Sequence, residues 1–472
     1  MKLYFIYNKM IRYLILLTLI SKILSLKTVL KFGGSSICNK LRIENVGNII
    51  LDEKEKGNKP VIVFSAIGDS TNLLINAGRR AITDNYVDIY NLKDRHYDLV
   101  SECDDKKLEK DVNKYFKEIE NILSGIYLLN DFSPRTKDLL SSYGERLSVR
   151  IISSYLNKKF NLNSRYFDSW DTGLVTTDRF EDALYLEDCK DDVNKFLNHY
   201  LNKDITPIVT GFICKSKEDK INTLGRGGSD LSATFLAKCI EADNVQIWKD
   251  VDGLMSADPK KIPNAIPVPH VTYNEARELA YFGAKILHPV SMIPAIQSNI
   301  PVYIKNSYNP EHIGTVISDK NESNNLVTAI TTKNNITLID IVSSRMLAQY
   351  GFLSKVFKIF EEDELSIDVI ASSEISISLT LDENNTINEN TLNKLSEIAC
   401  VQFKKDYSII SLISNVERSS DILNKVFEIL SNNKINIEMI SQGASKNNIS
   451  LVLKNKDCEK ALTLIHNTFF VN

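Results

Sequence analysis

Two glycine-rich stretches of this sequence carry charged side chains that could bind a phosphorylated or anionic ligand. KFGGSS (residues 31–36) places Lys31 beside two glycines and two hydroxyls. Backbone N–H groups of the glycines can hold phosphate oxygens, and the lysine can neutralise charge on a transferring phosphoryl group. TLGRGGSD (residues 223–230) sets Arg226 among three glycines, which indicates that the backbone approaches an anion closely.

Three further stretches combine charged and small residues. SSYGERLS (141–148) supplies Glu145, whose simplest interpretation is a capping carboxylate at a helix N-terminus. WKDVDGLMSADPKKIPNA (248–265) has the turn residues of a loop that wraps a nucleotide after a strand. FGAKILHP (282–289) places a lysine near a helix end, and its histidine is more typical of a structural residue than of a general base. The chain contains neither GxxxxGK[ST] nor GxGxxG.

Length and composition predict a soluble globular protein of several domains. The chain has 472 residues, of which 43% are hydrophobic and 25% charged. Its formal net charge of -3 gives no electrostatic reason to expect a nucleic-acid partner. The seven cysteines are widely spaced and form no CxxC pair, which favours reduced thiols over disulfides or a metal site.

The N-terminus carries a short apolar run. Lys9 and Arg12 precede YLILLTLI (13–20), which is too short to predict a membrane span. The run is typical of a targeting leader, although no A-x-A-like cleavage site follows it. The alternatives are a mis-assigned start of the chain and an extra buried strand. We therefore treat residues 1–26 as a hydrophobic leader, with the plastid and the cytoplasm as alternative destinations.

The first two-thirds of the chain alternate between predicted strands and helices. Segments of helical period, such as 229–242, lie between apolar runs. This order predicts a doubly wound α/β domain with ligands at the carboxyl ends of its strands. The charged stretch at 94–121 predicts a solvated helical insertion, and a polar linker indicates that the domain ends near residue 320. The apolar runs predicted as buried parallel strands are 28–36, 60–70, 206–213, 244–253 and 300–307.

The last third of the chain contains an internal repeat. Residues 352–373 align with 421–442, and the shared KVF gives an offset of 425 − 355 = 70 residues. Each copy has the pattern strand, helix, strand, strand, helix, which is typical of the ferredoxin-like class. The first copy has a candidate last strand at 401–405, whereas the second would need the spare strand at 325–331. The two modules would then be interwoven. A duplicated small module behind a larger domain suggests a sensor attached to an enzyme.

In this order, KFGGSS, GERLS, TLGRGGSD and FGAKILHP resemble the aspartokinase family, and the tail resembles its monofunctional, lysine-sensitive plant members. The resemblance covers nearly the whole chain from Lys27. It implies an α/β fold in which an amino-acid-kinase α/β/α sandwich precedes two ferredoxin-like ACT domains. The implied divisions are a leader at 1–26, a catalytic domain at 27–320, and ACT domains at 325–405 and 406–472.

The resemblance also implies an activity. Members phosphorylate the β-carboxylate of L-aspartate with ATP and give 4-phospho-L-aspartate, the first step towards lysine, threonine and methionine. Mg²⁺ would be bound through the ATP phosphates rather than by protein side chains. Lysine is the implied feedback inhibitor, and the implied assembly is a homodimer that pairs through the ACT domains.

Roles for the motif residues follow from the resemblance. Arg226 would hold the α-carboxylate of aspartate as a bidentate fork, Glu145 would hold the α-ammonium, and Asp230 would orient the arginine. Lys31 and Lys285 would neutralise charge around the phosphoryl group. No general base is required, because the β-carboxylate is already ionised. The other implied residues of the aspartate pocket are Ser65 and Thr71.

Nucleotide and effector positions are implied in the same way. The ATP positions are Lys31, Gly33, Gly34, Ser36, Lys249, Asp250, Met255, Lys260, Lys285 and Ile286. Many family members have tyrosine instead of Met255 and arginine instead of Lys260, so these departures would weaken ATP binding. Asp368 would pair with the ammonium group of lysine. The full set of lysine positions is Met346, Gln349, Phe352, Leu353, Ser366, Ile367, Asp368, Ser372 and Ser373.

Three alternative functions compete with this interpretation. A kinase of the same fold acting on glutamate, acetylglutamate or a nucleotide is disfavoured by the paired ACT modules. A catalytically dead amino-acid sensor is disfavoured because the charged motif residues are all present. A fused homoserine dehydrogenase is disfavoured because no dinucleotide motif occurs up to residue 472.

Overall fold

The computed structural model describes residues 25–84, 88–282, 287–320, 325–343, 351–383, 385, 387–414, 416–443 and 445–471. The chain divides into two compact units. Unit 1 comprises Met1–Gly253 and Leu287–Asp319, and unit 2 comprises Leu254–Ile286 and Lys320–Asn472. The predicted leader lies outside the described residues up to residue 24. Among the described residues, no helix is both long and apolar enough to cross a membrane.

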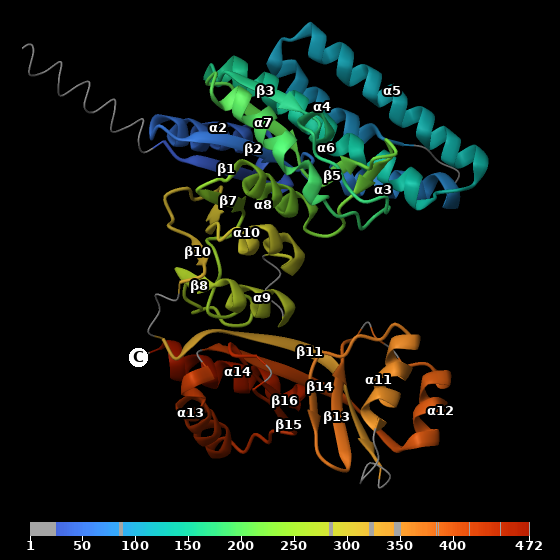
Figure 1. The fold of residues 1–472 in the computed structure, drawn as a ribbon, viewed down its shortest axis with the longest axis vertical. Coiled ribbons are helices and arrows are strands. Elements are labelled where there is room, and N and C mark those ends of the chain that lie inside the picture. The colour runs from blue at the N-terminus through green and yellow to red at the C-terminus, as the bar shows by residue number, and fades with distance from the viewer. Residues whose placement is uncertain are drawn as a thin grey trace, which may run out of the picture. The chain divides into compact units, whose positions relative to one another are not determined.

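Unit 1 is built on a mostly parallel sheet with helices on both faces (Figure 1). Its strands follow the order β3-β4-β2-β1-β7-β9-β10, and β10 alone among these pairs antiparallel with its neighbour. All five predicted parallel strands belong to this sheet, which confirms the predicted fold class, whereas β3 and β10 were missed. The strands are β1 (Lys27–Phe32), β2 (Lys59–Phe64), β3 (Ser164–Phe167), β4 (Thr206–Thr210), β7 (Asn244–Lys249), β9 (Val302–Asn306) and β10 (Thr315–Ser318).

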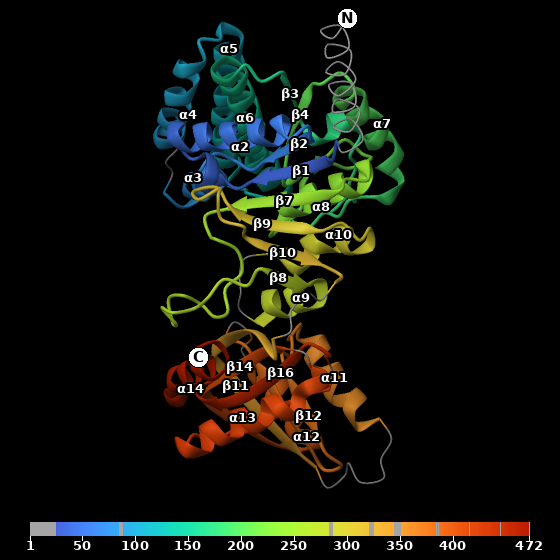
Figure 2. The ribbon, with the colours of Figure 1, turned by 90° about the vertical axis from the view of Figure 1, so that its left-hand side faces the viewer.

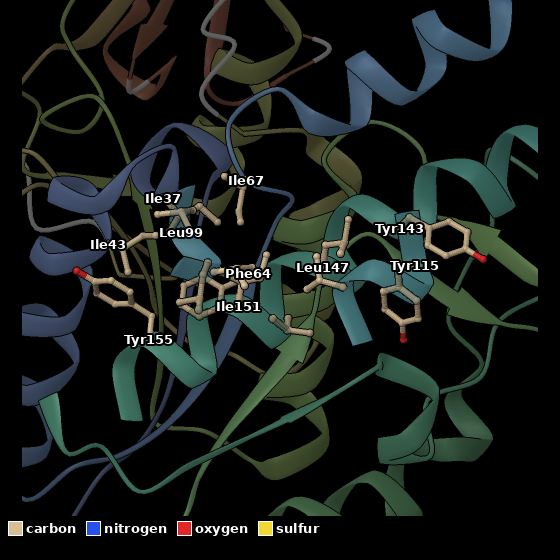
Figure 3. Close-up of a cluster of buried hydrophobic side chains, with 14 of the residues drawn as sticks. Ile37, Ile43, Phe64, Ile67, Leu99, Tyr115, Tyr143, Leu147, Ile151 and Tyr155 are labelled. Carbon is tan, nitrogen blue, oxygen red and sulfur yellow. The ribbon is translucent and has the colours of Figure 1, made fainter. Parts of the chain in front are cut away.

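Different helices cover the two faces of this sheet (Figure 2). Leu30 and Phe32 lie in register with Ile62 and Phe64, so all four side chains point to one face. They share one buried cluster with α2 to α6 (Figure 3), while α7, α8 and α10 pack on the other face. The helices are α2 (Lys40–Glu55), α3 (Ser70–Thr83), α4 (Tyr90–Cys103), α5 (Lys106–Leu129), α6 (Pro134–Phe160), α7 (Lys190–Leu201), α8 (Gly228–Ile240) and α10 (Ile293–Gln297).

The charged stretch at 94–121 is helical, as predicted, but it is not fully solvated. Helices α4 and α5 each turn an apolar stripe towards the buried cluster, to which α4 contributes Leu99 (Figure 3) and α5 contributes Val112, Phe116 and Ile119. In α5 these positions are spaced by three and four residues, which gives an amphipathic helix. The prediction of a solvated insertion is therefore wrong for one face of each helix.

Unit 2 contains one six-stranded sheet in the order β12-β13-β11-β14-β16-β15, all antiparallel. Four helices accompany it in two pairs, one pair for each copy of the sequence repeat. The strands are β11 (Val327–Val342), β12 (Ile370–Ser372), β13 (Ser376–Leu381), β14 (Cys400–Ser414), β15 (Met439–Ser441) and β16 (Asn448–Lys454). The helices are α11 (Phe352–Glu362), α12 (Glu389–Ile398), α13 (Ser419–Asn432) and α14 (Asn455–Phe470).

Two long strands, β11 and β14, belong to both repeats. The second half of β11 pairs with β13 and with the first half of β14, which closes the first module. The first half of β11, from Val327 to Lys333, pairs with the second half of β14, which also pairs with β16. The second module thus takes its fourth strand from the segment that precedes the first module. Each module is a four-stranded ferredoxin-like sheet, and the two are joined edge to edge through shared strands.

The segment 254–282 of unit 2 is fixed on the six-stranded sheet by buried polar contacts. Ser256 accepts a hydrogen bond from the Ile330 backbone and bonds the ring of His466 in α14 at 2.9 Å. In helix α9 (Tyr273–Phe282), Glu275 accepts from the Thr328 hydroxyl of β11 at 2.6 Å. The segment that carries two predicted ATP positions is therefore attached to the ACT modules within one unit.

Candidate active site

A pocket of about 290 Å³ lies in unit 1 at the carboxyl ends of its parallel strands. It collects residues from five separate stretches of the chain, among them the predicted Lys31, Gly34, Ser65, Thr71, Glu145 and Asp230. Its remaining lining residues are Ala66, Gly68, Phe212, Gly225, Gly227, Gly228 and Ser229. Phe212 and Ser229 were missed, because neither residue type signals chemistry without its neighbours.

Lys31 and Asp230, which line this pocket, form a charge cluster with Lys249. Lys31, near the end of β1, places its Nζ 2.6 Å from one carboxylate oxygen of Asp230 in the first turn of α8. Lys249, at the end of β7, places its Nζ 3.1 Å from the other oxygen. The side chains of Lys31 and Asp230 are only 8% and 5% exposed, so little water screens the pair.

The charge states of this cluster follow from its geometry. Burial alone would raise the pKa of Asp230, but the adjacent charges of Lys31 and Lys249 outweigh it and lower that pKa. The pKa of Lys31 is lowered by burial and by Lys249, against the opposing charge of Asp230. An ionised carboxylate between two ammonium groups leaves the cluster with excess positive charge, which suits a polyphosphate.

Glu145 is a buried carboxylate in the middle of α6, which corrects the simple prediction of a helix cap. Its Oε1 accepts from the Ala66 backbone N–H at 3.3 Å and, weakly, from the Thr71 hydroxyl at 3.5 Å. Its Oε2 is buried and has no hydrogen-bond partner among the described residues. Burial raises the pKa of Glu145 to about 8. A buried carboxylate oxygen without a partner indicates a place for a ligand cation.

Two glycines are required by the close approach of the loops around this pocket. A side chain at Gly34 would clash with the backbone carbonyl of Gly68, so the KFGGSS and SAIGDS loops can touch only through glycine. Gly227 has a φ of 74°, and a Cβ there would lie 2.5 Å from the Cβ of His288. His288 therefore packs against the glycine loop, in agreement with a structural role.

Arg226 does not take the position predicted for its side chain. It lies between Gly225 and Gly227, which line the pocket, but its own side chain is exposed and is not part of the lining. Asp230 does not orient it, because the carboxylate of Asp230 is engaged by Lys31 and Lys249. That predicted role of Asp230 is wrong in this structure.

Two side chains that follow β9, whose roles the sequence analysis missed, hold the KFGGSS loop in place. The Ser307 hydroxyl, just after β9, forms hydrogen bonds with the Ser36 hydroxyl at 2.8 Å and with the Lys249 carbonyl oxygen at 3.0 Å. The Tyr308 hydroxyl donates to the Ser35 carbonyl at 3.1 Å. These contacts fix two predicted ATP segments to each other. Serine and tyrosine in NSYNP carry no motif that would have identified them.

The other predicted nucleotide positions that the structure describes lie outside this network of side-chain hydrogen bonds. Gly33 precedes the short helix at Gly34–Ile37, and Asp250 is exposed after β7. Met255 and Lys260 belong to unit 2, where Met255 is half-buried and Lys260 is exposed. Lys285 and Ile286 lie outside the described residues.

The predicted effector positions that the structure describes lie at the start of α11, in the stretch before β12 and at the end of β12. Phe352 is buried at the start of α11, Leu353 and Ser366 are exposed, and Ile367 is half-buried. The side chain of Asp368 is 2% exposed and forms an ion pair with Lys333 at 2.7 Å. Ser372 and Ser373 are exposed beyond it. Met346 and Gln349 lie outside the described residues.

The pocket in unit 1 combines the elements needed for phosphoryl transfer to a small zwitterion. It has a positive cluster fixed at a glycine loop and, in the lining of the same cavity, a carboxylate suited to an ammonium group. The described residues contain no group of three or more His, Cys, Asp or Glu side chains that could hold a metal ion.

Two family models match the chain. The amino acid kinase family matches residues 27–306, and the ACT domain matches residues 410–469. The first match covers most of unit 1 with its pocket, and the second covers the second regulatory module.

The chain is also similar to named proteins over most of its length. It is 42% identical to chloroplastic aspartokinase 2 of Arabidopsis thaliana, over 94% of this chain and 84% of that protein. Crystal structures of Escherichia coli aspartokinase III resemble it over 94% of this chain and 99% of theirs. The complex with aspartate and ADP has a TM-score of 0.77 at 28% identity. The complex with lysine and aspartate has a TM-score of 0.71 at 29% identity.

Proposed function

Because the chain belongs to the aspartokinase family, we propose that its unit 1 pocket binds L-aspartate beside ATP and transfers the γ-phosphoryl group to the β-carboxylate. The single observation that carries the proposal is that a positively charged cluster and a buried carboxylate occur at the same pocket. One is the Lys31–Asp230–Lys249 cluster, and the other is the buried, unpartnered oxygen of Glu145.

Aspartate needs an anion for its ammonium and a cation for its α-carboxylate. Glu145 supplies the anion, since its Oε2 is buried without a partner at the pocket. Arg226 supplies the cation after its exposed side chain turns towards the substrate, and its guanidinium then binds the carboxylate through two parallel hydrogen bonds. These two contacts leave the β-carboxylate to face the phosphoryl donor.

The reaction requires positioning rather than proton transfer. A β-carboxylate oxygen of aspartate attacks the γ-phosphorus of ATP, an O–P bond forms, and the bond to the oxygen bridging the β- and γ-phosphorus breaks. ADP and 4-phospho-L-aspartate are the products. The nucleophile is ionised at neutral pH, so no side chain has to accept a proton. Mg²⁺, bound to the ATP phosphates, supplies further charge neutralisation.

Lys31 acts on the transferring group, and Asp230 acts on Lys31. The carboxylate fixes the Nζ of Lys31 at 2.6 Å, so the ammonium is held in place before the substrate binds. Preorganised charge of this kind lowers the barrier because little reorganisation is needed during the reaction. Lys249 and the backbone of Gly33 and Gly34 would hold the β- and γ-phosphates.

A coupled assay of ADP release tests the proposed function. The whole chain with MgATP should release ADP with L-aspartate, and much more slowly with L-glutamate or N-acetylglutamate. Glutamate is longer by one methylene, so its distal carboxylate would not meet the phosphorus when its ammonium is bound to Glu145. Equal rates with glutamate would refute the aspartate assignment, and the absence of ADP release with every acceptor would support an inactive sensor.

Substituting Arg226 tests how the substrate is recognised. We expect Arg226→Lys to raise the KM for aspartate about tenfold or more, because it removes a bidentate fork but keeps the charge. The KM for ATP should change little and serves as the internal control. The measurement is a steady-state titration of each substrate at saturating concentrations of the other. A larger effect on ATP would show that the arginine binds the nucleotide.

Lysine regulation is proposed for the first ACT module. The E. coli structure bound to lysine supports an effector of this kind. In this chain the side chain of Asp368 is only 2% exposed and one of its oxygens has no hydrogen-bond partner among the described residues, whereas its counterpart Glu438 accepts a hydrogen bond from the side chain of Asn436 at 3.3 Å. We expect Asp368→Ala to raise the lysine concentration for half-inhibition by about tenfold or more, since it removes one partner of a buried charge pair. Glu438→Ala should respond to lysine as the wild type does, and the reverse result would assign the effector to the second module.

Assembly and location are further parts of the proposal. Chloroplastic relatives at 42% and 43% identity support delivery of this chain to a plastid by residues 1–26. A fluorescent protein carrying these residues should enter plastids, and a diffuse cytoplasmic signal would contradict this. For its assembly, we propose that two copies of the chain form a homodimer, which pairs through the ACT modules. Light scattering of the whole chain should give twice the mass of 53.4 kDa, and a monomer would exclude it.

A further inference from the structure

Asp368 already carries a partner that resembles the proposed effector. The Nζ of Lys333, in the middle of β11, lies 2.7 Å from Asp368 Oδ1. The hydroxyl of Tyr281, in α9, donates to the same oxygen at 3.3 Å. The other oxygen, Oδ2, is buried and has no hydrogen-bond partner among the described residues. The chain itself therefore already pairs one oxygen of this carboxylate, and a second ammonium group at Asp368 would have to share the carboxylate with Lys333 and Tyr281.

Lys333 has a second carboxylate within reach. Its Nζ lies 3.4 Å from Asp382 Oδ2, so a small rotation could exchange one partner for the other. Its Nζ also lies 5.7 Å from the ring centre of Tyr281, close enough for a cation–π contact. Lys333, Tyr281 and Asp368 thus form one polar cluster within unit 2.

The cluster fixes the C-terminal end of α9 on the regulatory sheet. Next to Tyr281, the backbone carbonyl of Phe282 accepts from the Thr331 hydroxyl of β11 at 3.0 Å. At the other end of the helix, Glu275 bonds Thr328 of the same strand. Phe282 precedes Lys285, the second predicted phosphoryl-binding lysine, by three positions in the chain. A change at Asp368 would therefore act on the end of α9 that leads to Lys285.

We propose that Lys333 and Tyr281 are internal competitors of the effector, so that an ammonium-bearing ligand binds Asp368 only by weakening both contacts. The inference rests on the proposed role of Asp368 in lysine binding. The incoming ammonium takes the carboxylate, Lys333 moves its ion pair to Asp382, and Tyr281 loses its hydrogen bond. Helix α9 is then held less firmly at its C-terminal end. Inhibition follows because the ligand favours the released arrangement of α9 over the docked one.

The proposed competition predicts that removing a side-chain group that contacts the Asp368 carboxylate strengthens the binding of the effector, whereas the loss of a binding-site contact usually weakens it. We expect Lys333→Met to lower the dissociation constant of L-lysine about tenfold, within the usual range of coupling between two ligands. Tyr281→Phe removes one hydroxyl and should lower it by about threefold or more. In Tyr281→Phe, saturating lysine should also inhibit a smaller fraction of the activity, since part of the coupling is already lost.

The experiment is isothermal titration of L-lysine into the whole chain, with inhibition curves for the same variants. Lys404→Met is the matched control, because Lys404 forms a similar ion pair with Asp340 at 2.9 Å in the same sheet without touching Asp368. Its lysine affinity should equal that of the wild type. Tyr281→Phe keeps the test valid if Lys333→Met does not fold.

The possible failures are distinguishable. If the wild type binds no lysine, or if Asp368→Ala binds it unchanged, the proposed effector site is wrong and the competition falls with it. If Asp368→Ala loses binding while Lys333→Met and Tyr281→Phe bind lysine equally or more weakly than the wild type, the competition alone is overturned. Tighter binding in both variants, with Lys404→Met unchanged, supports it.

Discussion

The Lys31→Met variant should lose about 10³-fold or more in kcat, with a much smaller change in the KM for aspartate. The ammonium of Lys31 is buried at the pocket and fixed by Asp230 at 2.6 Å, so its charge is in place when negative charge shifts during the transfer. Methionine keeps most of the apolar stem and removes only the charge. Steady-state kinetics with both substrates varied give the two constants separately.

A structural explanation of the same loss has to be excluded. Without Lys31, the buried carboxylate of Asp230 retains Lys249 alone, which could distort the pocket. The double variant Lys31→Met/Asp230→Asn also removes the carboxylate that has lost one of its two partners. If it recovers most of the lost kcat, Lys31 is a structural partner and not a phosphoryl-binding residue. Lys27→Met, at the other end of β1, is the control and should retain kcat, because the ammonium of Lys27 donates to the backbone carbonyl of Ile240 and does not line the pocket.

Glu145→Gln should raise the KM for aspartate by about 10²-fold or more, since it removes one charge of a buried pair formed with the substrate ammonium. Glutamine has nearly the same shape, so the contacts of Oε1 with Ala66 and Thr71 can persist. The KM for ATP and the thermal midpoint should stay close to those of the wild type. Glu53→Gln is a matched control, because Glu53 is also buried but lies at the end of α2 and does not line the pocket.

The pH dependence of kcat/KM for aspartate, compared between the wild type and Glu145→Gln, gives an independent check of the role of Glu145. Burial raises the pKa of Glu145 to about 8, so the empty pocket holds mostly the protonated acid at neutral pH. Only the ionised form binds an ammonium group. For the wild type, kcat/KM for aspartate should therefore rise about tenfold per pH unit below pH 8 and level off above it. This limb should vanish in Glu145→Gln, and a flat wild-type profile between pH 6 and 8 would contradict the role of Glu145.

The fold was accessible from the sequence wherever a local pattern sufficed. The buried parallel strands show as apolar runs that end in glycine or small polar residues, as at Gly33 after β1 and Gly211 after β4. The repeat of the ACT modules was visible through the shared KVF and its constant offset. The strands β3 (SRYF) and β10 (TVIS) were not visible, because four residues are too few to give a recognisable pattern. The buried faces of α4 and α5 were not visible either, because charged residues dominate their composition.

The site was accessible only in part, for physical reasons that differ between residues. Lys31 and Glu145 stand in recognisable motifs. The partner of Asp230 could not be inferred, because it depends on how β1, β7 and α8 converge at one edge of the sheet. Ser307 and Lys333 carry no motif at all. Their roles arise from contacts with residues far away in the sequence, which only the folded chain brings together.

Identification of the product tests the central claim most directly. The whole chain is incubated with MgATP, L-aspartate and hydroxylamine, which converts an acyl phosphate into a stable hydroxamate. Mass spectrometry then distinguishes the β-hydroxamate from the α-isomer. We predict the β-hydroxamate of aspartate, formed in equal amount with ADP, dependent on both substrates and lost in Lys31→Met. The α-isomer, or ADP release without any hydroxamate, would contradict the proposed transfer to the β-carboxylate.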